Sequence, residues 1–492
     1  MMRTTGLLLA VLTSLLLGAC AKAPLATAPA PERAAIEANL MRDIAVLASD
    51  EFGGRRPGTP GEDRTVAYII EQMEIAGLVS GTNDPGSAWR APVELVSSMP
   101  LESSITVRTN RGELEIPETG GAAFAGSRRA LIDGVEVVFV GREAESVAPE
   151  SIVGKIVVMM GEPGVSPRRR ATLFEANPAA IITVVEDEDA IANVQRAFGR
   201  ERLVLAGEEN DRLTAFIASP LMETAFPEGE WQELVAAAGE DEFEPRTVEA
   251  TIAIDARTSK REFTSSNILG MLPGAVPESG AVLLLGHWDH LGECGSEEEG
   301  DLICNGAIDN ASGIAVMLEL SRRLAASGPF DRDIYVLATS AEESGLLGAQ
   351  AFVEQPPLPL ETIVAAFNFD TVAVAPAGSA VGFVGEGRTP LDEVVLEVLA
   401  DSGRELGNRE FAESFVRRQD GWALLDNGVP AVFLSTAFGS EIVLGPYLSA
   451  DYHRPSDEID RIELGGAIDD LLLHEELVRR VASTTAYPNS PQ

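Results

Sequence analysis

Two histidines stand at the end of an apolar run in the segment LLLGHWDHLG, residues 283–292. They are His287 and His290, and the whole chain has only 4 histidines. Because successive residues of a strand point to opposite faces, His287 and Asp289 would share one face and His290 would take the other. We therefore expect His287 to bind a metal ion and Asp289 to orient it, without His290 on the same metal.

Other residues that can bind a metal follow further apolar runs. They are Asp309, Glu342, Glu343, Asp370 and His453. In an open sheet of parallel strands, ligands bind beyond the carboxyl ends of the strands, so these side chains should meet at one edge. Each residue alone could equally be a helix cap or a surface group. Their common position favours a metal site with a carboxylate general base.

Apolar runs alternate with helical patterns from residue 256 onward. We expect strands at AVLLLGH, DIYVLATS, IVAAFNFD and AVFLST, and helices at 311–327, 345–355, 389–402 and about 462–484. Another helix is expected at 61–76, ended by Gly77. Continuous apolar strands that alternate with helices indicate an α/β fold, with a mostly parallel central sheet flanked by helices.

The pattern of apolar and polar residues changes in residues 91–255. Short runs such as VEVVFVG and KIVVMM are separated by glycine, proline and charged residues, and helical periodicity is scarce. We interpret this stretch as an inserted, mostly β domain with one or two helices. It would divide the main domain into residues 32–90 and 256–485.

The N-terminal residues are typical of an exported lipoprotein. Arg3 precedes the apolar run GLLLAVLTSLLL, which is too short to span a bilayer, and the run ends in LLGAC. This end resembles a bacterial lipobox, so residues 1–20 are expected to be a lipoprotein signal segment with lipid attached to Cys20. Residues 21–31 would be a flexible tether. An ordinary secreted protein is the alternative to a membrane-anchored lipoprotein facing the periplasm or the cell exterior.

Composition bears on partners and on cross-links. The formal net charge is −40, so phosphate backbones would be repelled and nucleic-acid binding is not expected. Export favours a disulfide between Cys294 and Cys304, with free thiols or a soft metal site as alternatives. His474, on the last predicted helix, is expected at the surface. The sequence does not determine the oligomeric state.

Taken together, GHWDHLG, NGAIDNASG, SAEESGLLGA, NFD and DYHRPSDEID resemble the signature of the family 28 metallopeptidases. This family contains zinc aminopeptidases related to glutamate carboxypeptidase and to glutaminyl cyclases, with a zinc-exopeptidase fold. The resemblance covers roughly residues 32–90 and 256–485. The insert is similar to the protease-associated domain that many members carry.

The resemblance implies a site for two zinc ions. His287 and Asp370 would hold one ion, and Glu343 and His453 would hold the other. Asp309 would bridge the two ions. The family also implies a cis peptide bond after this bridging aspartate.

Glu342 would be the general base, which takes a proton from water and passes it to the leaving amine. The chain departs from the family at Ile308, where relatives commonly have Asp, and near Gln419, where many have Ser-Asp-His. The second departure borders the substrate pocket and leaves substrate preference open. Tyr447 and Tyr452 are candidate oxyanion donors, although a packing role suits both equally well.

The implied function is that of a zinc-dependent exopeptidase. We expect an aminopeptidase that hydrolyses the N-terminal residues of peptides. A glutaminyl cyclase-type acyltransferase with a single zinc and a catalytically inactive binding module are the alternatives. The insert argues against a cyclase, and the intact set of site residues argues against an inactive module.

Overall fold

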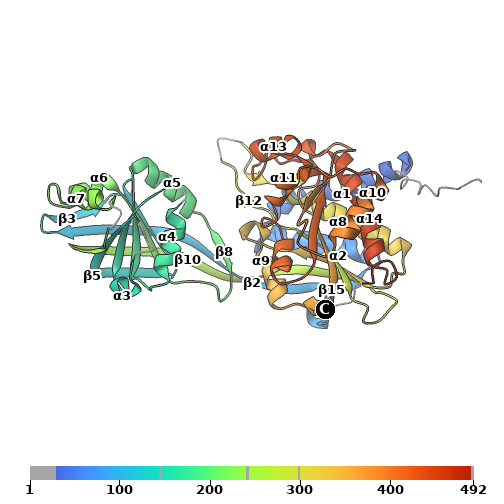
Figure 1. The fold of residues 1–492 in the computed structure, drawn as a ribbon, viewed down its shortest axis with the longest axis horizontal. Coiled ribbons are helices and arrows are strands. Elements are labelled where there is room, and N and C mark those ends of the chain that lie inside the picture. Colours follow the sequence, from blue (N-terminus) through green and yellow to red (C-terminus); the bar gives the residue numbers. More distant parts are fainter. Residues whose placement is uncertain (1–28, 143–146, 163–164, 240–242, 297–299, 489–492) are drawn as a thin grey trace, which may run out of the picture.

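The structure is a computed structural model, which describes residues 29–142, 147–162, 165–239, 243–296 and 300–488. The predicted signal segment with Cys20, and most of the predicted tether, lie outside these ranges. The described chain forms two lobes joined by long strands (Figure 1). Within the described ranges, no helix combines the length and the apolar character that crossing a membrane requires.

The larger lobe is built on a mostly parallel sheet, which confirms the prediction. Its strands run in the order β16, β17, β15, β11, β14, β10. Their bounds are β10 (Arg246–Leu272), β11 (Ala281–His287), β14 (Asp333–Thr339), β15 (Ile363–Asn368), β16 (Gly382–Val384) and β17 (Ala431–Ser435). The four inner strands are parallel, and β16 and β10 are antiparallel to their neighbours at the two sides. Every residue of β11 is buried, which explains its continuous apolar run.

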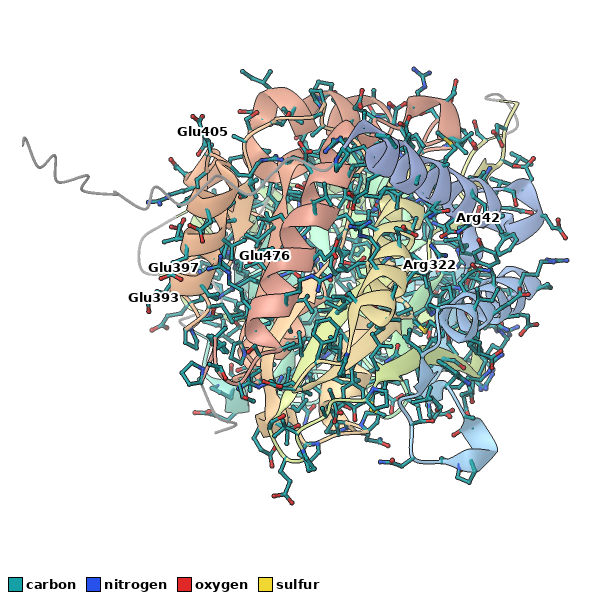
Figure 2. The ribbon with its side chains drawn as sticks, turned by 90° about the vertical axis from the view of Figure 1, so that its right-hand side faces the viewer. Arg42, Arg322, Glu393, Glu397, Glu405 and Glu476 are labelled. Carbon is teal, nitrogen blue, oxygen red and sulfur yellow. A yellow bond between two sulfur atoms is a disulfide. The ribbon has the colours of Figure 1, made fainter. Side chains whose placement is uncertain are left out.

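Helices cover both faces of this sheet. One face carries α1 (Ala30–Leu47), α2 (Pro60–Ile75), α8 (Gly313–Ser327) and α14 (Leu464–Val481), and α10 (Asp392–Ser402) packs beside α14. In Figure 2, α14, α8 and α1 lie side by side in front of the sheet. The other face carries α9 (Leu347–Glu354) and α12 (Gly421–Asp426). Leu284 packs into the first core and Leu285 into the second, so strand alternation divides β11 between them.

Two strands run through both lobes. β2 (Arg90–Thr109) and β10 pair antiparallel from Arg90 opposite Ile268 to Thr109 opposite Ala250. In the smaller lobe the sheet continues from β10 through β5, β6, β7, β9 and β4. The bounds are β4 (Gly121–Ala125), β5 (Arg129–Gly141), β6 (Ile156–Met160), β7 (Ala180–Val185) and β9 (Leu213–Ala218). The short strands β3 (Gly112–Ile116) and β8 (Arg202–Leu205) pair with β2.

The smaller lobe has more helices than the one or two predicted. They are α3 (Pro149–Ile152), α4 (Ser166–Phe174), α5 (Glu188–Phe198), α6 (Ser219–Ala225) and α7 (Glu230–Ala237). Several are too short to show an apolar period, and α4 contains three consecutive arginines. Both limits of the predicted insert, residues 91 and 255, fall inside the shared strands. That residues 91–255 form a domain of their own stays a prediction.

Candidate metal centre

The candidate ligands lie where parallel strands of the larger lobe end. His287 is the last residue of β11, and Asp370 follows the end of β15. Glu342 and Glu343 begin the short helix η4 (Glu342–Ser344), which follows β14. The carboxyl ends of parallel strands meet at one edge of the sheet, and these side chains are brought together there.

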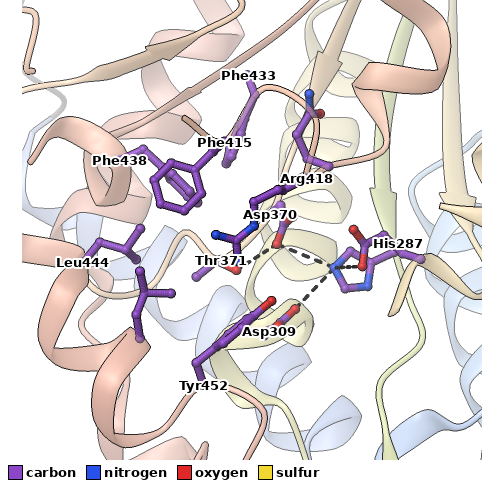
Figure 3. A pocket seen from close by; sticks show the side chains of 13 residues that line it. His287, Asp309, Asp370, Thr371, Phe415, Arg418, Phe433, Phe438, Leu444 and Tyr452 are labelled. Atoms are coloured by element: carbon purple, nitrogen blue, oxygen red, sulfur yellow. Dashed lines mark hydrogen bonds and ion pairs between the residues drawn. The ribbon is translucent and has the colours of Figure 1, made fainter. Parts of the chain in front are cut away.

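Three carboxylates surround His287 (Figure 3). Its Nε2 atom lies 3.3 Å from Asp309 Oδ1 and 3.6 Å from Asp370 Oδ1. The same atom lies 4.0 Å from Glu342 Oε2. The side chain of His287 is only 2% exposed, so these charges interact with little screening by water.

A second group forms around Glu343. Its Oε2 atom lies 2.8 Å from His453 Nε2, and its Oε1 atom lies 2.5 Å from His290 Nδ1. Asp309 joins the two groups, because its Oδ1 faces His287 and its Oδ2 lies 3.4 Å from His453 Nε2. Asp309 therefore occupies the position that a bridging ligand needs.

The position of His290 differs from the simple strand prediction. That prediction assumes that the strand continues through His287, Asp289 and His290. Because β11 ends at His287, alternation does not apply to the residues that follow. The ring of His290 lies edge to face against that of His453, with centroids 5.8 Å apart. His290 thus stays apart from His287 but enters the second group.

Asp289 fixes the backbone of the two glutamates. Its Oδ1 accepts the N–H of Glu342 at 3.0 Å, and its Oδ2 accepts the N–H of Glu343 at 3.4 Å. Toward His287, the carbonyl oxygen of Asp289 lies 3.2 Å from Nδ1 and the carboxylate lies 3.8 Å away. The carboxylate therefore positions η4, and mainly the main chain of Asp289 faces the histidine ring.

The turn η3 (Ala307–Ser312), which carries Asp309, is held from two sides. The carboxylate of Asp457 accepts the N–H groups of Ile308 at 2.8 Å and of Asp309 at 3.1 Å. Asn310 Nδ2 donates to the carbonyl oxygen of His287 at 3.2 Å. The peptide bond between Asp309 and Asn310 is cis, as the resemblance implies. These bonds tie the turn to the end of β11.

Arg55 lies fully buried behind the cluster and was not predicted as a site residue. Its guanidinium donates to the carbonyl oxygens of Trp288 (2.8 Å), Asn305 (2.5 Å) and Gly306 (3.0 Å). Burial lowers the pKa of Arg55 to about 10, although nearby carboxylates such as Asp309 favour its charged form. One buried cation thus holds two site loops together and offsets part of their negative charge.

Four residues at the cluster have left-handed backbone conformations although none is glycine. They are Arg55, Ala341, Thr371 and His453, with φ of 49°, 54°, 49° and 59°. Such a conformation costs a non-glycine residue roughly 1–2 kcal/mol. Residues of this kind concentrate at functional sites, where the surrounding structure enforces them.

The cluster opens into a pocket with an empty volume of about 440 Å³. The polar wall of this pocket includes His287, Asp309, Glu342, Asp370, Arg418 and Gln419. The opposite wall is apolar and includes Phe415, Phe433, Phe438 and Leu444 (Figure 3). Leu448 also lines the pocket. The segment at which the chain departs from the family near Gln419 thus lines this pocket.

Electrostatics distinguish two of the carboxylates. Burial raises the pKa of Glu342 well above its usual range; His287 opposes this shift, and Glu343 and Asp370 add to it. Burial would also raise the pKa of Asp309, but hydrogen bonds with His287 and other groups hold it well below its usual range. Glu342 can therefore carry a proton under conditions in which Asp309 is ionised.

The residues fit a metal ion by type and by distance. Two sets have ligand atoms within 4.8 Å of one another: His287, Asp309 and Asp370, and His290, Asp309 and Glu343. Imidazole nitrogens and carboxylate oxygens are the donors that zinc takes from proteins. Buried carboxylates at this density also need cationic charge nearby.

The two tyrosines lie at different depths. Tyr452 lines the pocket, and its ring stacks on that of His453 at 3.7 Å. Tyr447 is buried and donates from its hydroxyl to Asp457 Oδ2 at 3.0 Å. Tyr447 therefore supports the turn behind the cluster, and Tyr452 is the one that borders the pocket.

The expectation that His474 lies at the surface is wrong. Its ring is fully buried on α14 and packs 4.6 Å from the ring of Phe369. Nδ1 donates to the carbonyl oxygen of Asp470 at 2.7 Å. A terminal helix is expected to have one side open to water. At His474, however, the sheet and the neighbouring helices cover α14.

The two cysteines close a small hairpin beside the cluster. Cys294 and Cys304 form a disulfide with their Cα atoms 5.7 Å apart. The bond joins the ends of β12 (Gly292–Glu293) and β13 (Ile303–Cys304). Cys294 Sγ also lies 3.8 Å from the carbonyl oxygen of His453.

Comparison with known proteins gives relatives that include two bacterial aminopeptidases. Over 107 residues the chain is 36% identical to aminopeptidase YwaD of Bacillus subtilis, which covers 22% of this chain and 20% of YwaD. Over 357 residues it is 24% identical to a probable lipoprotein aminopeptidase, LpqL, of Mycobacterium tuberculosis, which covers 70% of this chain and 65% of LpqL. The matches thus span from a fifth to about two thirds of these relatives.

The fold is that of a solved aminopeptidase from Aneurinibacillus sp. strain AM-1. That structure is 18% identical, covers 94% of this chain and 96% of its own, and has a TM-score of 0.59. The model of peptidase family M28 matches residues 267–471, which include every candidate metal ligand. The chain therefore contains, at residues 267–471, a domain of peptidase family M28.

Proposed function

We propose that this protein is a zinc-dependent aminopeptidase. The observation that carries the proposal is the convergence of histidines and carboxylates on one sheet edge, where they open into a pocket with one polar and one apolar wall. Relatives named as aminopeptidases support the same activity. Its substrates would be peptides, from which it removes N-terminal residues.

Two zinc ions per chain are proposed. His287 and Asp370 would hold one ion, Glu343 and His453 the other, and Asp309 both. A zinc ion held by these residues would act as a Lewis acid and would activate water as a nucleophile near neutral pH. The position of Asp309, with one oxygen toward each group, supports a shared ligand.

Glu342 is the proposed general base. It lines the pocket beside His287, and its backbone is fixed by Asp289. In this role its carboxylate takes a proton from the attacking water and delivers it to the leaving amine. Tyr452, at the rim of the same pocket, can donate a hydrogen bond to the oxygen that gains charge.

The apolar wall of the pocket supports a preference for apolar N-terminal residues. Phe415, Phe433 and Phe438 face the metal cluster across the pocket (Figure 3). Removing one methylene from a residue bound in such a pocket costs about 1 kcal/mol or more. Leucyl and phenylalanyl substrates should therefore be cleaved faster than glycyl and aspartyl ones.

The test is hydrolysis of aminoacyl and peptidyl reporters with and without a chelator. We expect chelator-sensitive release of N-terminal residues, restored by zinc. The variant Glu342→Gln should retain zinc, measured by atomic absorption, but lose at least about 10³-fold in kcat. Glu354→Gln, at an exposed position on α9, is the matched control and should be fully active.

Two results would contradict this function. Unchanged turnover in Glu342→Gln would show that Glu342 is not the general base. Release of ammonia from glutaminyl peptides without shortening of the chain would point to a cyclase. If the active protein held one zinc ion per chain, only the proposed number of ions would be wrong.

We further propose that the chain is exported and lipid-anchored through Cys20, and that residues 91–255 are a protease-associated-type insert. The apolar run and the LLGAC segment support the anchor. Radiolabelled palmitate should be incorporated into the chain and not into Cys20→Ser. Equal labelling of both would contradict the anchor.

A further inference from the structure

A second pocket lies in the smaller lobe, away from the metal cluster. Its empty volume is about 1080 Å³, and α4, β8 and β9 contribute to its walls. The cations Arg170, Arg202, Arg212 and Lys260 line it, together with the aromatic rings of Phe174 and Phe198. A wall that combines several cations with aromatic rings suits an anion that also has an apolar part.

Among the described residues, no carboxylate pairs with the three guanidinium groups. Arg170 Nη1 donates to Thr183 Oγ1 at 3.3 Å, and Arg202 Nη2 donates to the carbonyl oxygen of Ala197 at 3.3 Å. None of the three arginines forms an ion pair with any residue that the structure describes. Arg170 is half-buried, and burial lowers its pKa, so its charge is partly desolvated. Arg202 and Arg212 are exposed to water.

Aromatic rings hold these guanidinium groups in place. Arg202 lies 4.6 Å above the ring of Phe198, and Arg212 lies 5.1 Å above the ring of Phe174. Arg170 stacks on Phe198 from 5.8 Å. Stacking leaves the edges of a guanidinium free to donate hydrogen bonds, so these groups are preorganised for a planar carboxylate.

The charge of this pocket is opposite in sign to the net charge of the molecule. The chain has a net charge of −40, yet this pocket has four cations and a single acidic residue, Glu209. The carboxylate of Glu209 is engaged by its own backbone and by the N–H of Gly207, and Lys260 lies near it. The field inside the pocket therefore favours anions that the rest of the surface repels.

β8 connects this pocket with the metal centre. Arg202 and Val204 of this strand line the pocket. The alternate residue Leu205 packs in one apolar cluster with Ala341, which precedes Glu342. A ligand held by Arg202 would thus lie on the outer side of the strand that supports η4.

We propose that this pocket binds the carboxylate of a peptide, with an apolar side chain of the same peptide against the phenylalanine rings. The carboxylate can be the C-terminal group or an acidic side chain. Three arginines and one lysine supply the charge, and Phe174 and Phe198 supply the apolar surface. The choice of a peptide as the ligand rests on the proposed peptidase function.

The test is calorimetric titration of the purified protein with three N-acetylated peptides, which an aminopeptidase cannot shorten. They are acetyl-Ala-Leu-Phe with a free carboxylate, its C-terminal amide, and acetyl-Ala-Glu-Phe amide. We expect the free acid or the glutamyl amide to bind, and to bind more weakly as salt rises. Acetyl-Ala-Leu-Phe amide should not bind. Comparison of the two carboxylate peptides identifies which source of carboxylate is used.

Variants of the arginines test whether the peptide binds in this pocket. Arg202→Gln and Arg212→Gln should each weaken it about tenfold or more, because each removes a charge-assisted hydrogen bond. Arg246→Gln is the matched control, since Arg246 also stacks on a phenylalanine of this lobe, Phe243, but does not line the pocket. Circular dichroism and the unfolding temperature confirm that each variant is folded.

Three results would overturn the proposal. They are absence of binding by both carboxylate peptides, equal binding in both pocket variants and the wild type, and tighter binding of inorganic phosphate than of either peptide. None of these results depends on turnover. Failure of this pocket is therefore distinguishable from failure of the aminopeptidase assignment, which the hydrolysis assay tests separately.

Discussion

Single residues at the cluster act in ways that their types alone do not reveal. Asp289 was assigned to His287 because the two are alternate residues, yet its carboxylate binds the N–H groups of Glu342 and Glu343. These glutamates begin η4 after Ala341, whose φ of 54° turns the chain sharply. Asp289 therefore positions one proposed ligand and the proposed base together.

Replacing Asp289 by asparagine tests this positioning. An amide nitrogen would face one of the two N–H groups, and the turn that carries the glutamates would shift. We expect zinc affinity or kcat to fall about 10- to 100-fold, as outer partners of metal ligands commonly cause. Competition with a chelator measures zinc affinity. Asp460→Asn, at an exposed site, is the control. Equal zinc affinity together with equal kcat in the two variants would contradict the role.

That these side chains meet could be predicted from the sequence, because His287, Glu343 and Asp370 lie at or after the ends of recognisable strands. Arg55 could not, because its partners are carbonyl oxygens, which every residue has. His290 lies apart from His287, as expected, but its place beside Glu343 could not be predicted because the pattern does not reveal that β11 stops at His287. Side-chain types reveal donors, whereas the end of a strand depends on the contacts around it.

At the scale of elements, regular apolar patterns predicted the main helices and strands. The helix expected at 61–76 is α2, and Gly77 follows it with a φ of 88°. α1 was not predicted, although Ile36, Leu40, Ile44 and Leu47 are buried along one face of it. Its alanine- and proline-rich start resembles the tether before it, which obscured this pattern.

α14 contains a buried histidine whose protonation should affect stability. Burial lowers the pKa of His474 to about 4, and its hydrogen bond to the Asp470 carbonyl only partly opposes this. The unfolded chain then binds a proton near its ordinary pKa of about 6.5, while the folded chain does not. The stability linked to this neutral histidine is complete above about pH 6.5 and is lost as pH falls toward 4.

The variant His474→Gln isolates this effect, because glutamine does not titrate. The free energy of unfolding of the wild type should fall, relative to that of the variant, by about 3 kcal/mol between pH 7 and pH 4. Denaturant titrations at several pH values measure it. Asp470, whose pKa burial raises to about 7, is common to both proteins and cancels in the difference. Parallel pH curves would refute the assignment.

At the scale of the whole molecule, separate apolar cores stabilise the two lobes. One core contains residues such as Ile44, Leu284 and Leu471, and another contains Phe139, Ile182 and Trp231. The whole chain carries 77 acidic and 37 basic side chains. Repulsion among like charges favours expanded states and therefore opposes folding.

Salt should stabilise the protein by weakening this repulsion. The Debye length falls from about 30 Å at 0.01 M to about 8 Å at 0.15 M, so distant acidic groups no longer interact. We expect the unfolding temperature at pH 7 to rise over this range, measured by calorimetry. A fall would mean that attractive surface pairs dominate. A rise that begins only in molar salt would reflect salting-out of apolar surface instead.

The two lobes are joined by paired strands and not by a flexible linker. β2 and β10 remain hydrogen-bonded to each other from one lobe into the other, without a flexible segment between them. Proteases cut backbone that can leave its hydrogen bonds, which is scarce along such a ribbon. Brief digestion should therefore clip surface loops but leave both halves in one particle on a sizing column, with no small half released before the whole protein melts.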